Sequence, residues 1–146
     1  MPTEVVRAWQ SALAAEQEAA FGYALLGPRL RGTAQLSLAV QCSDAHEALR
    51  DDTSSALAAA GSTPGGPAAD YPQLYPVDTA AQAGDLAPLL EDRCAAAWRY
   101  LYAVASRPAA HPLTAVRRDA QAALSASAVR AVRWRGAAAP PAFPGM

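Results

Sequence analysis

The chain has 146 residues, a formal net charge of −1 and a pI near 6.1. This length fits one domain that can bury a sizeable core without disulfides or metals. Because nucleic-acid binding needs a clustered surplus of basic side chains, the charge argues against a nucleic-acid partner. The chain has no run of 18 apolar residues, and its first residues lack the pattern of a secretion signal. We therefore expect no membrane association and a cytoplasmic location.

Apolar residues recur with helical spacing in four segments, which predicts an all-α fold in a single domain over residues 1–146. The helices are expected near residues 3–27, 33–60, 85–106 and 112–135. Thr3 should cap the first helix, and Gly27 and Gly61 should end the first two helices in the left-handed conformation. Cys42 and Cys94 fall in different helices without metal-ligand spacing, which predicts buried free thiols.

Between the second and third helices, residues 61–77 hold four prolines and three glycines, which excludes a helix or a central strand. Seventeen extended residues reach at most about 56 to 60 Å. The preceding helix, at 1.5 Å per residue, is only about 42 Å long. The segment can therefore return along a whole helix, and it predicts a long crossover that leaves the second and third helices parallel.

The third helix has two conceivable starts. Thr79 and Gln82 have the spacing of a capping box, in which each side chain bonds the other residue's free amide. Pro88 follows within the same span and removes a helical hydrogen bond. We prefer a start near Asp85, which places Pro88 in the first turn, over a longer helix that kinks at the proline.

The fourth helix is predicted to open with Pro112 at its first position and to close at Gly136. The tail, residues 137–146, is too rich in proline for regular structure. Phe143 is expected to pack against the end of the bundle.

Polar side chains interrupt the apolar stripe near the middle of each predicted helix. Glu16, His46, Glu91 and Ser127 should meet at one level of the bundle. Arg50, at the edge of the second helix's stripe, is the expected partner of Glu16, because a buried carboxylate without a partner is too costly. Three interpretations stay open: a satisfied core network, a small-ligand pocket, or a site for one metal ion held by Glu16, His46 and Glu91.

The stretches AAEQEAAFGYALLGPRL, SDAHEALRDD, LLEDRCAAAWRYL and AVRAVRWRG followed by AFPG resemble a bacterial ferritin-like family, a domain of unknown function, over nearly the whole chain. The resemblance implies a ferritin-like four-helix bundle. Di-iron proteins of that type carry one Glu on each of two helices and Glu-x-x-His on each of the other two. Glu16 and Glu91 match the single glutamates, but Ser43 precedes His46 by three residues and the fourth predicted helix has neither Glu nor His. The implied di-metal ligand set is degenerate.

Two classes of function therefore stay open. The favoured class is a metal-free structural or interaction module, able to form a homodimer and without a cofactor. The alternative is a metal-binding or redox ferritin-like protein, with a single metal ion, or a protein that binds a small ligand in the bundle core. No catalytic residue is predicted, and an enzyme is the less favoured interpretation because the fourth predicted helix lacks metal ligands.

Overall fold

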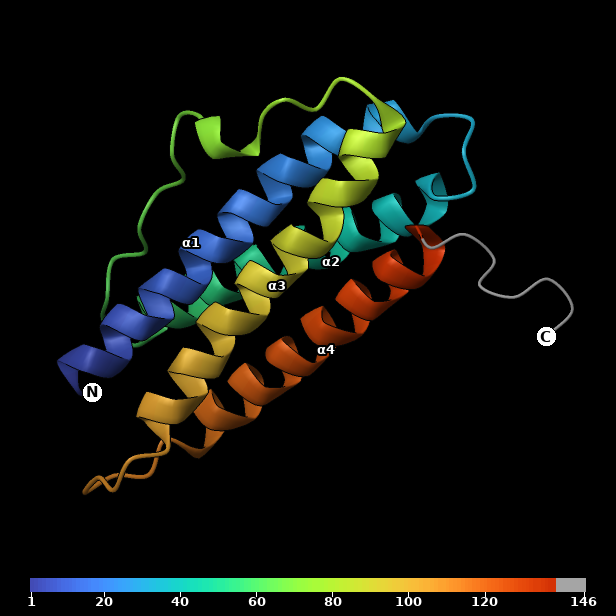
Figure 1. The fold of residues 1–146 in the computed structure, drawn as a ribbon. Helices are drawn as coiled ribbons and strands as arrows, with labels where there is room; N and C mark the ends of the chain where they lie inside the picture. Colours follow the sequence, from blue (N-terminus) through green and yellow to red (C-terminus); the bar gives the residue numbers. More distant parts are fainter. Residues whose placement is uncertain (139–146) are drawn as a thin grey trace, which may run out of the picture.

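The computed structural model describes residues 1–138, and the regular elements in this range are all helices. Four are long: α1 (Thr3–Leu26), α2 (Leu36–Ala59), α3 (Ala80–Ala105) and α4 (Thr114–Ala138). Two are short 3₁₀ helices: η1 (Gly27–Leu30) and η2 (Pro72–Leu74). Figure 1 shows the long helices lying side by side as a bundle. The predicted all-α class is confirmed, whereas the packing expected of Phe143 lies outside the described residues.

Close packing joins three pairs of helices, α1 with α2, α1 with α3, and α3 with α4. The remaining side of the bundle, between α2 and α4, lacks comparable packing within residues 1–138. None of the described helices has the length and apolar character needed to cross a bilayer. The bundle therefore has three tightly packed sides and one looser side.

Residues 60–79 connect α2 to α3 by running along the outside of α1 (Figure 1). Near the start of this segment, Gln10 Nε2 donates a hydrogen bond to the carbonyl of Thr63 at 2.8 Å. Near its end, Arg29 Nε donates to the carbonyl of Val77 at 3.0 Å. The contacting residues come later in both segments at the second contact than at the first: Arg29 follows Gln10, and Val77 follows Thr63. The connecting segment therefore runs in the same direction as α1. As a result, α2 and α3 run in the same direction.

The first turn of α3 begins at Ala80, so the preferred start near Asp85 is wrong. Thr79 Oγ1 accepts a hydrogen bond from the amide of Gln82 at 3.1 Å, and Gln82 Oε1 accepts one from the amide of Thr79 at 3.2 Å. This capping box satisfies two amides that a helix start otherwise leaves free. The helix then continues through Pro88, because its first two turns bury apolar side chains that a later start would expose. These are Ala83, Leu86 and Ala87.

Both ends of α1 depart from the expected caps, whereas the glycine expected to end α2 has its predicted conformation. Thr3 is the first helical residue, and Pro2 precedes it without a side-chain cap. Gly27 has φ −54°, so the chain continues in a right-handed turn into η1, whose start tolerates Pro28 because no amide donor is needed there. Gly61, with φ +83°, has the left-handed conformation predicted for it.

The bounds of α4 differ from the prediction at both ends. The carbonyl of Leu113 accepts the first helical hydrogen bond, from Arg117 at 3.0 Å, so the helix begins at Thr114 rather than at Pro112. Gly136 does not adopt a left-handed conformation, and the helix passes through it to Ala138. Glycine permits a left-handed end but does not impose one.

Helices α1 and α3 approach closely at Gly22. A Cβ atom at this position would lie 2.5 Å from Leu90 Cδ1, which is closer than any real carbon contact. Only glycine fits there without a shift of Leu90 or of the helix. This close approach lies directly beside Tyr23 and Glu91, which follow Gly22 and Leu90 in the sequence.

Candidate functional site

His46, on α2, lies at the centre of the polar side chains in the core. Its Nδ1 lies 2.5 Å from Glu16 Oε2 on α1, and its Nε2 lies 2.7 Å from Glu91 Oε2 on α3. All three side chains are fully buried. A carboxylate can only accept, so each ring nitrogen must carry a proton to make both bonds. The geometry therefore describes an imidazolium held between two carboxylates.

The other oxygens of these carboxylates also have donors. Trp98 Nε1 donates to Glu16 Oε1 at 2.8 Å, and Arg130 Nε donates to Glu91 Oε1 at 2.8 Å. The hydroxyl of Tyr23 donates to Glu91 Oε2 at 2.6 Å. Each of the four carboxylate oxygens is thus hydrogen-bonded, as buried charged groups must be.

The charges in this network balance. Two carboxylates oppose one imidazolium and one guanidinium, which gives a sum of zero. Burial by itself lowers the pKa of His46, but the hydrogen bonds and charges of Glu16 and Glu91 overcome it and raise that pKa to about 9. Burial by itself raises the pKa of Glu91, but its bonds with His46, Tyr23 and Arg130 bring that pKa below its usual value. Each ionised group is therefore stabilised by the opposite charge beside it.

Ser127, the polar residue predicted on the inner face of the fourth helix, is fully buried. Its hydroxyl accepts a hydrogen bond from Arg130 Nη2 at 3.2 Å. Ser127 therefore orients the guanidinium that reaches Glu91 instead of contacting His46 itself. Sequence reasoning missed Arg130, although its position three residues after Ser127 places it on the same face of α4.

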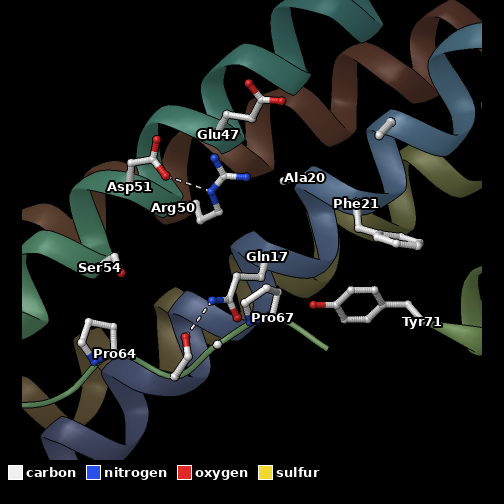
Figure 2. A pocket seen from close by; sticks show the side chains of 13 residues that line it. Gln17, Ala20, Phe21, Glu47, Arg50, Asp51, Ser54, Pro64, Pro67 and Tyr71 are labelled. Atoms are coloured by element: carbon white, nitrogen blue, oxygen red, sulfur yellow. Dashed lines mark hydrogen bonds and ion pairs between the residues drawn. The ribbon is translucent and has the colours of Figure 1, made fainter. Parts of the chain in front are cut away.

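Arg50 does not pair with Glu16, so that part of the sequence prediction is wrong. Its Nε donates to Asp51 Oδ1 at 2.9 Å, and its side chain is 36% exposed. Figure 2 shows it with Glu47 on the wall of an open pocket between α1, α2 and the connecting segment. Arg50 lies one turn after His46 on α2, but its side chain extends to Asp51 and solvent instead of into the core.

Both cysteines are free and buried, as predicted. Cys94 Sγ lies 3.5 Å from the carbonyl of Ala15, to which the thiol donates. Burial, followed by the negative charges of Glu16 and Glu91, raises the pKa of Cys94 well above its ordinary value. One ligand atom from each of Glu16, His46 and Cys94 lies within 4.8 Å of the others, a spacing that a metal ion could bridge.

The residues present do not fit the two-metal centre that the ferritin-like resemblance would imply. Both nitrogens of His46 are engaged by carboxylates, and both oxygens of Glu91 already have donors. On α4, the side chain that reaches this level is the Arg130 guanidinium, a cation where the di-iron pattern has a carboxylate and an imidazole. Two added cations would therefore meet a site whose negative charge is already neutralised.

The fold and the network define a class of protein: an all-helical bundle with a charge-balanced polar core. The family model described as Domain of unknown function (DUF4439) matches residues 8–146, and the chain belongs to this family. It is also similar to the solved structure titled "Crystal structure of a conserved hypothetical protein, rv2844, from Mycobacterium tuberculosis". The two share 30% identity with a TM-score of 0.80, over 93% of this chain and 98% of that chain. No curated protein matches.

Proposed function

We propose that the protein is a ferritin-like bundle that works without metal, as a structural or interaction module. The observation that carries the proposal is the position of His46, whose two ring nitrogens hydrogen-bond Glu16 and Glu91. In a di-iron protein the carboxylates at this level hold metal cations. Here the imidazolium and the Arg130 guanidinium supply the positive charge instead.

Two features support the ferritin-like relationship. The connection in residues 60–79 follows α1 and leaves α2 and α3 running in the same direction, which is the crossover topology of that group. Glu16 on α1 and Glu91 on α3 also stand where the single glutamates of the group belong, facing a histidine from α2. The departures are Ser43 on α2 and Arg130 on α4.

The network also suits a structural role because it draws on all four long helices. Glu16 comes from α1, His46 from α2, Glu91 from α3 and Arg130 from α4. A buried ionic network adds little net stability compared with apolar packing, but it penalises any arrangement that leaves a charge unpaired. Sliding one helix by a turn would break several of these bonds at once. The network therefore specifies the register of the bundle.

The test is metal loading. Protein purified without chelators is loaded anaerobically with ferrous iron, dialysed, exposed to oxygen and analysed for bound metal. We expect well under one equivalent of iron per chain and no oxygen-dependent absorbance, because a two-metal centre needs carboxylates that are free to hold it. Two retained irons per chain, lost in a Glu16→Gln variant, would overturn the proposal.

A single metal ion is the second candidate, favoured by the spacing of Glu16, His46 and Cys94. Both His46 and Cys94 must lose protons to bind a metal, and the pKa of each is raised. Binding by this set would therefore strengthen as the pH rises. Cobalt(II) titrated at pH 7 and at pH 9 would give a thiolate-to-metal absorption band that is stronger at pH 9 and absent in Cys94→Ser. Without that band the second candidate fails.

A further inference from the structure

A groove runs along the looser side of the bundle, between α2 and α4. It consists of two adjoining cavities of about 410 Å³ and 430 Å³, which share Ala45, Ala126 and Arg130 in their walls. Both volumes are in the range of pockets that hold small organic ligands. The early part of α2 lies opposite the late part of α4 in one cavity, and the later part of α2 lies opposite the early part of α4 in the other. The groove therefore follows the two helices lengthwise.

Small and apolar side chains make up most of the groove, and its ends differ in charge. The middle is lined by alanines of both helices, and Trp9 and Trp98 line the cavity that extends toward the start of α4. Asp52 and Asp119 also line that end. Arg133 lines the other end, one turn beyond Arg130. A ligand in the groove thus meets positive charge at one end and negative charge at the other.

Arg130 lies where the two cavities adjoin and lines both of them. Its Nε and Nη2 donate to Glu91 and Ser127, while its Nη1 has no protein acceptor among residues 1–138. The side chain is 14% exposed and contributes to both cavities. Glu91 already offsets the charge of Arg130, so an anionic oxygen bonded to Nη1 also draws on the positive charge of Arg133, one turn further along α4.

We propose that this groove binds an elongated apolar molecule with a single carboxylate, of the fatty-acid class. The carboxylate lies on Arg130 and Arg133, and the apolar chain follows the alanines toward Trp9 and Trp98. At 1.5 Å per residue, Asp119 and Arg130 are about 16 Å apart along α4, which a chain of roughly twelve carbons spans. Asp52 repels a second carboxylate at the far end, and Asp119, although paired with Arg118, offers it no positive charge, so a dicarboxylate is disfavoured.

This proposal does not depend on the absence of metal from the core. The ligand occupies a groove beside the network and uses Arg130 Nη1, which has no acceptor among the described residues. Metal loading and ligand binding are separate measurements. Either proposal can therefore fail while the other stands.

The experiment is titration of the full-length protein with dodecanoate below its critical micelle concentration, followed by calorimetry and tryptophan fluorescence. We expect about one equivalent bound per chain, with a change in emission because Trp9 and Trp98 line the groove. Dodecanol and dodecanedioate are the matched ligands. Each should bind about tenfold more weakly or worse, because one lacks the charge and the other carries a second charge onto Asp52 and Asp119.

Two pairs of variants locate the ligand without disturbing the network. Ala126→Leu fills the shared wall of both cavities, whereas Ala128→Leu adds the same bulk to an exposed position of α4 that lines neither cavity. Arg133→Gln removes the outer charge, whereas Arg135→Gln removes another exposed charge, which is paired with Asp92 outside the groove. Ala126→Leu should weaken dodecanoate binding by about tenfold or more, and Arg133→Gln by roughly three- to tenfold. The two control variants should leave it unchanged.

Several results would overturn the proposal. Absence of saturable binding, or many equivalents bound per chain, would exclude a defined site. Equal affinity for dodecanol would exclude the role of Arg130 and Arg133. Equal losses in Ala126→Leu and Ala128→Leu would place the ligand outside the groove.

Discussion

The buried network and the groove beside it differ in one respect: how completely their polar groups are satisfied. In the network, each oxygen of Glu16 and Glu91 has a donor, and each nitrogen of His46 has an acceptor. In the groove, Arg130 offers a donor that no described protein group accepts. The guanidinium of Arg130 therefore completes the hydrogen bonding of the network and also offers an unused donor to the groove. A satisfied network maintains structure, whereas a fixed but unsatisfied donor in an apolar groove can recognise a ligand.

The largest expected effect is on the free energy of unfolding. It should differ between substitution of Arg130, a cation in the core network, and substitution of Arg50, a cation at the surface. Arg130→Met leaves Glu91 with one charge partner fewer in the core, and we expect a loss of about 3 to 5 kcal/mol in the free energy of unfolding. Arg50→Met, on the same scale, should change it by less than about 0.5 kcal/mol, because Arg50 is paired only with the exposed Asp51. Urea unfolding of both variants makes the comparison. Equal losses would show that Arg130 is not part of the core network.

A pH titration of stability should show the imidazolium directly. The pKa of His46 is raised to about 9 in the folded protein, from 6.5 when unfolded. The stabilisation is therefore complete below pH 6.5 and is lost as the pH rises toward 9, by about 3 kcal/mol in all. The raised thiol pKa values of Cys42 and Cys94 act in the same direction, but mainly above about pH 8.5.

The control for this titration is His46→Gln, which keeps a polar side chain but cannot titrate. Its free energy of unfolding should be lower at pH 6.5 and nearly flat between pH 6.5 and 8.5. A parent protein that is equally flat in this range would mean that His46 is neutral in the folded state. The charge balance described for the network would then be wrong.

The smallest effect expected within the network concerns Tyr23, one of three donors to Glu91. Tyr23→Phe removes only the hydroxyl, and His46 and Arg130 still hold the carboxylate. We expect a loss of about 1 to 2 kcal/mol in the free energy of unfolding, with unchanged dodecanoate affinity. Tyr71→Phe is the matched control, since Tyr71 is also buried but its hydroxyl accepts a hydrogen bond from the amide of Ala68 in the connecting segment, outside the network. A loss of ligand affinity in Tyr23→Phe would show that the two regions are coupled.

The sequence was sufficient to predict the all-α class and the residues at the centre of the network. Glu16, His46 and Glu91 interrupt apolar stripes at the same level, and a charged residue in such a stripe must find partners. The partners themselves were harder to predict. Arg50 was favoured because it lies near His46 in sequence, whereas Arg130 comes from another helix and reaches Glu91 by the length of its side chain.

The start of α3 could not be read from local rules for a related reason. Proline in a helix and a capping box make opposite predictions, and neither includes tertiary burial. In the structure, burial of the residues between Thr79 and Pro88 decides the outcome. The groove was likewise invisible in the sequence, because it depends on the separation of α2 and α4 rather than on any motif.

Gly22 lies at a close contact between α1 and α3, next to the buried network. It directly precedes Tyr23 on α1, and Leu90, which it contacts, directly precedes Glu91 on α3. The 2.6 Å bond between Tyr23 and Glu91 therefore lies one residue away from a position where a methyl group requires Leu90 to shift. An alanine at this position would displace the Leu90 side chain next to Glu91. A change at an apolar position would thus reach the polar network through the packing beside it.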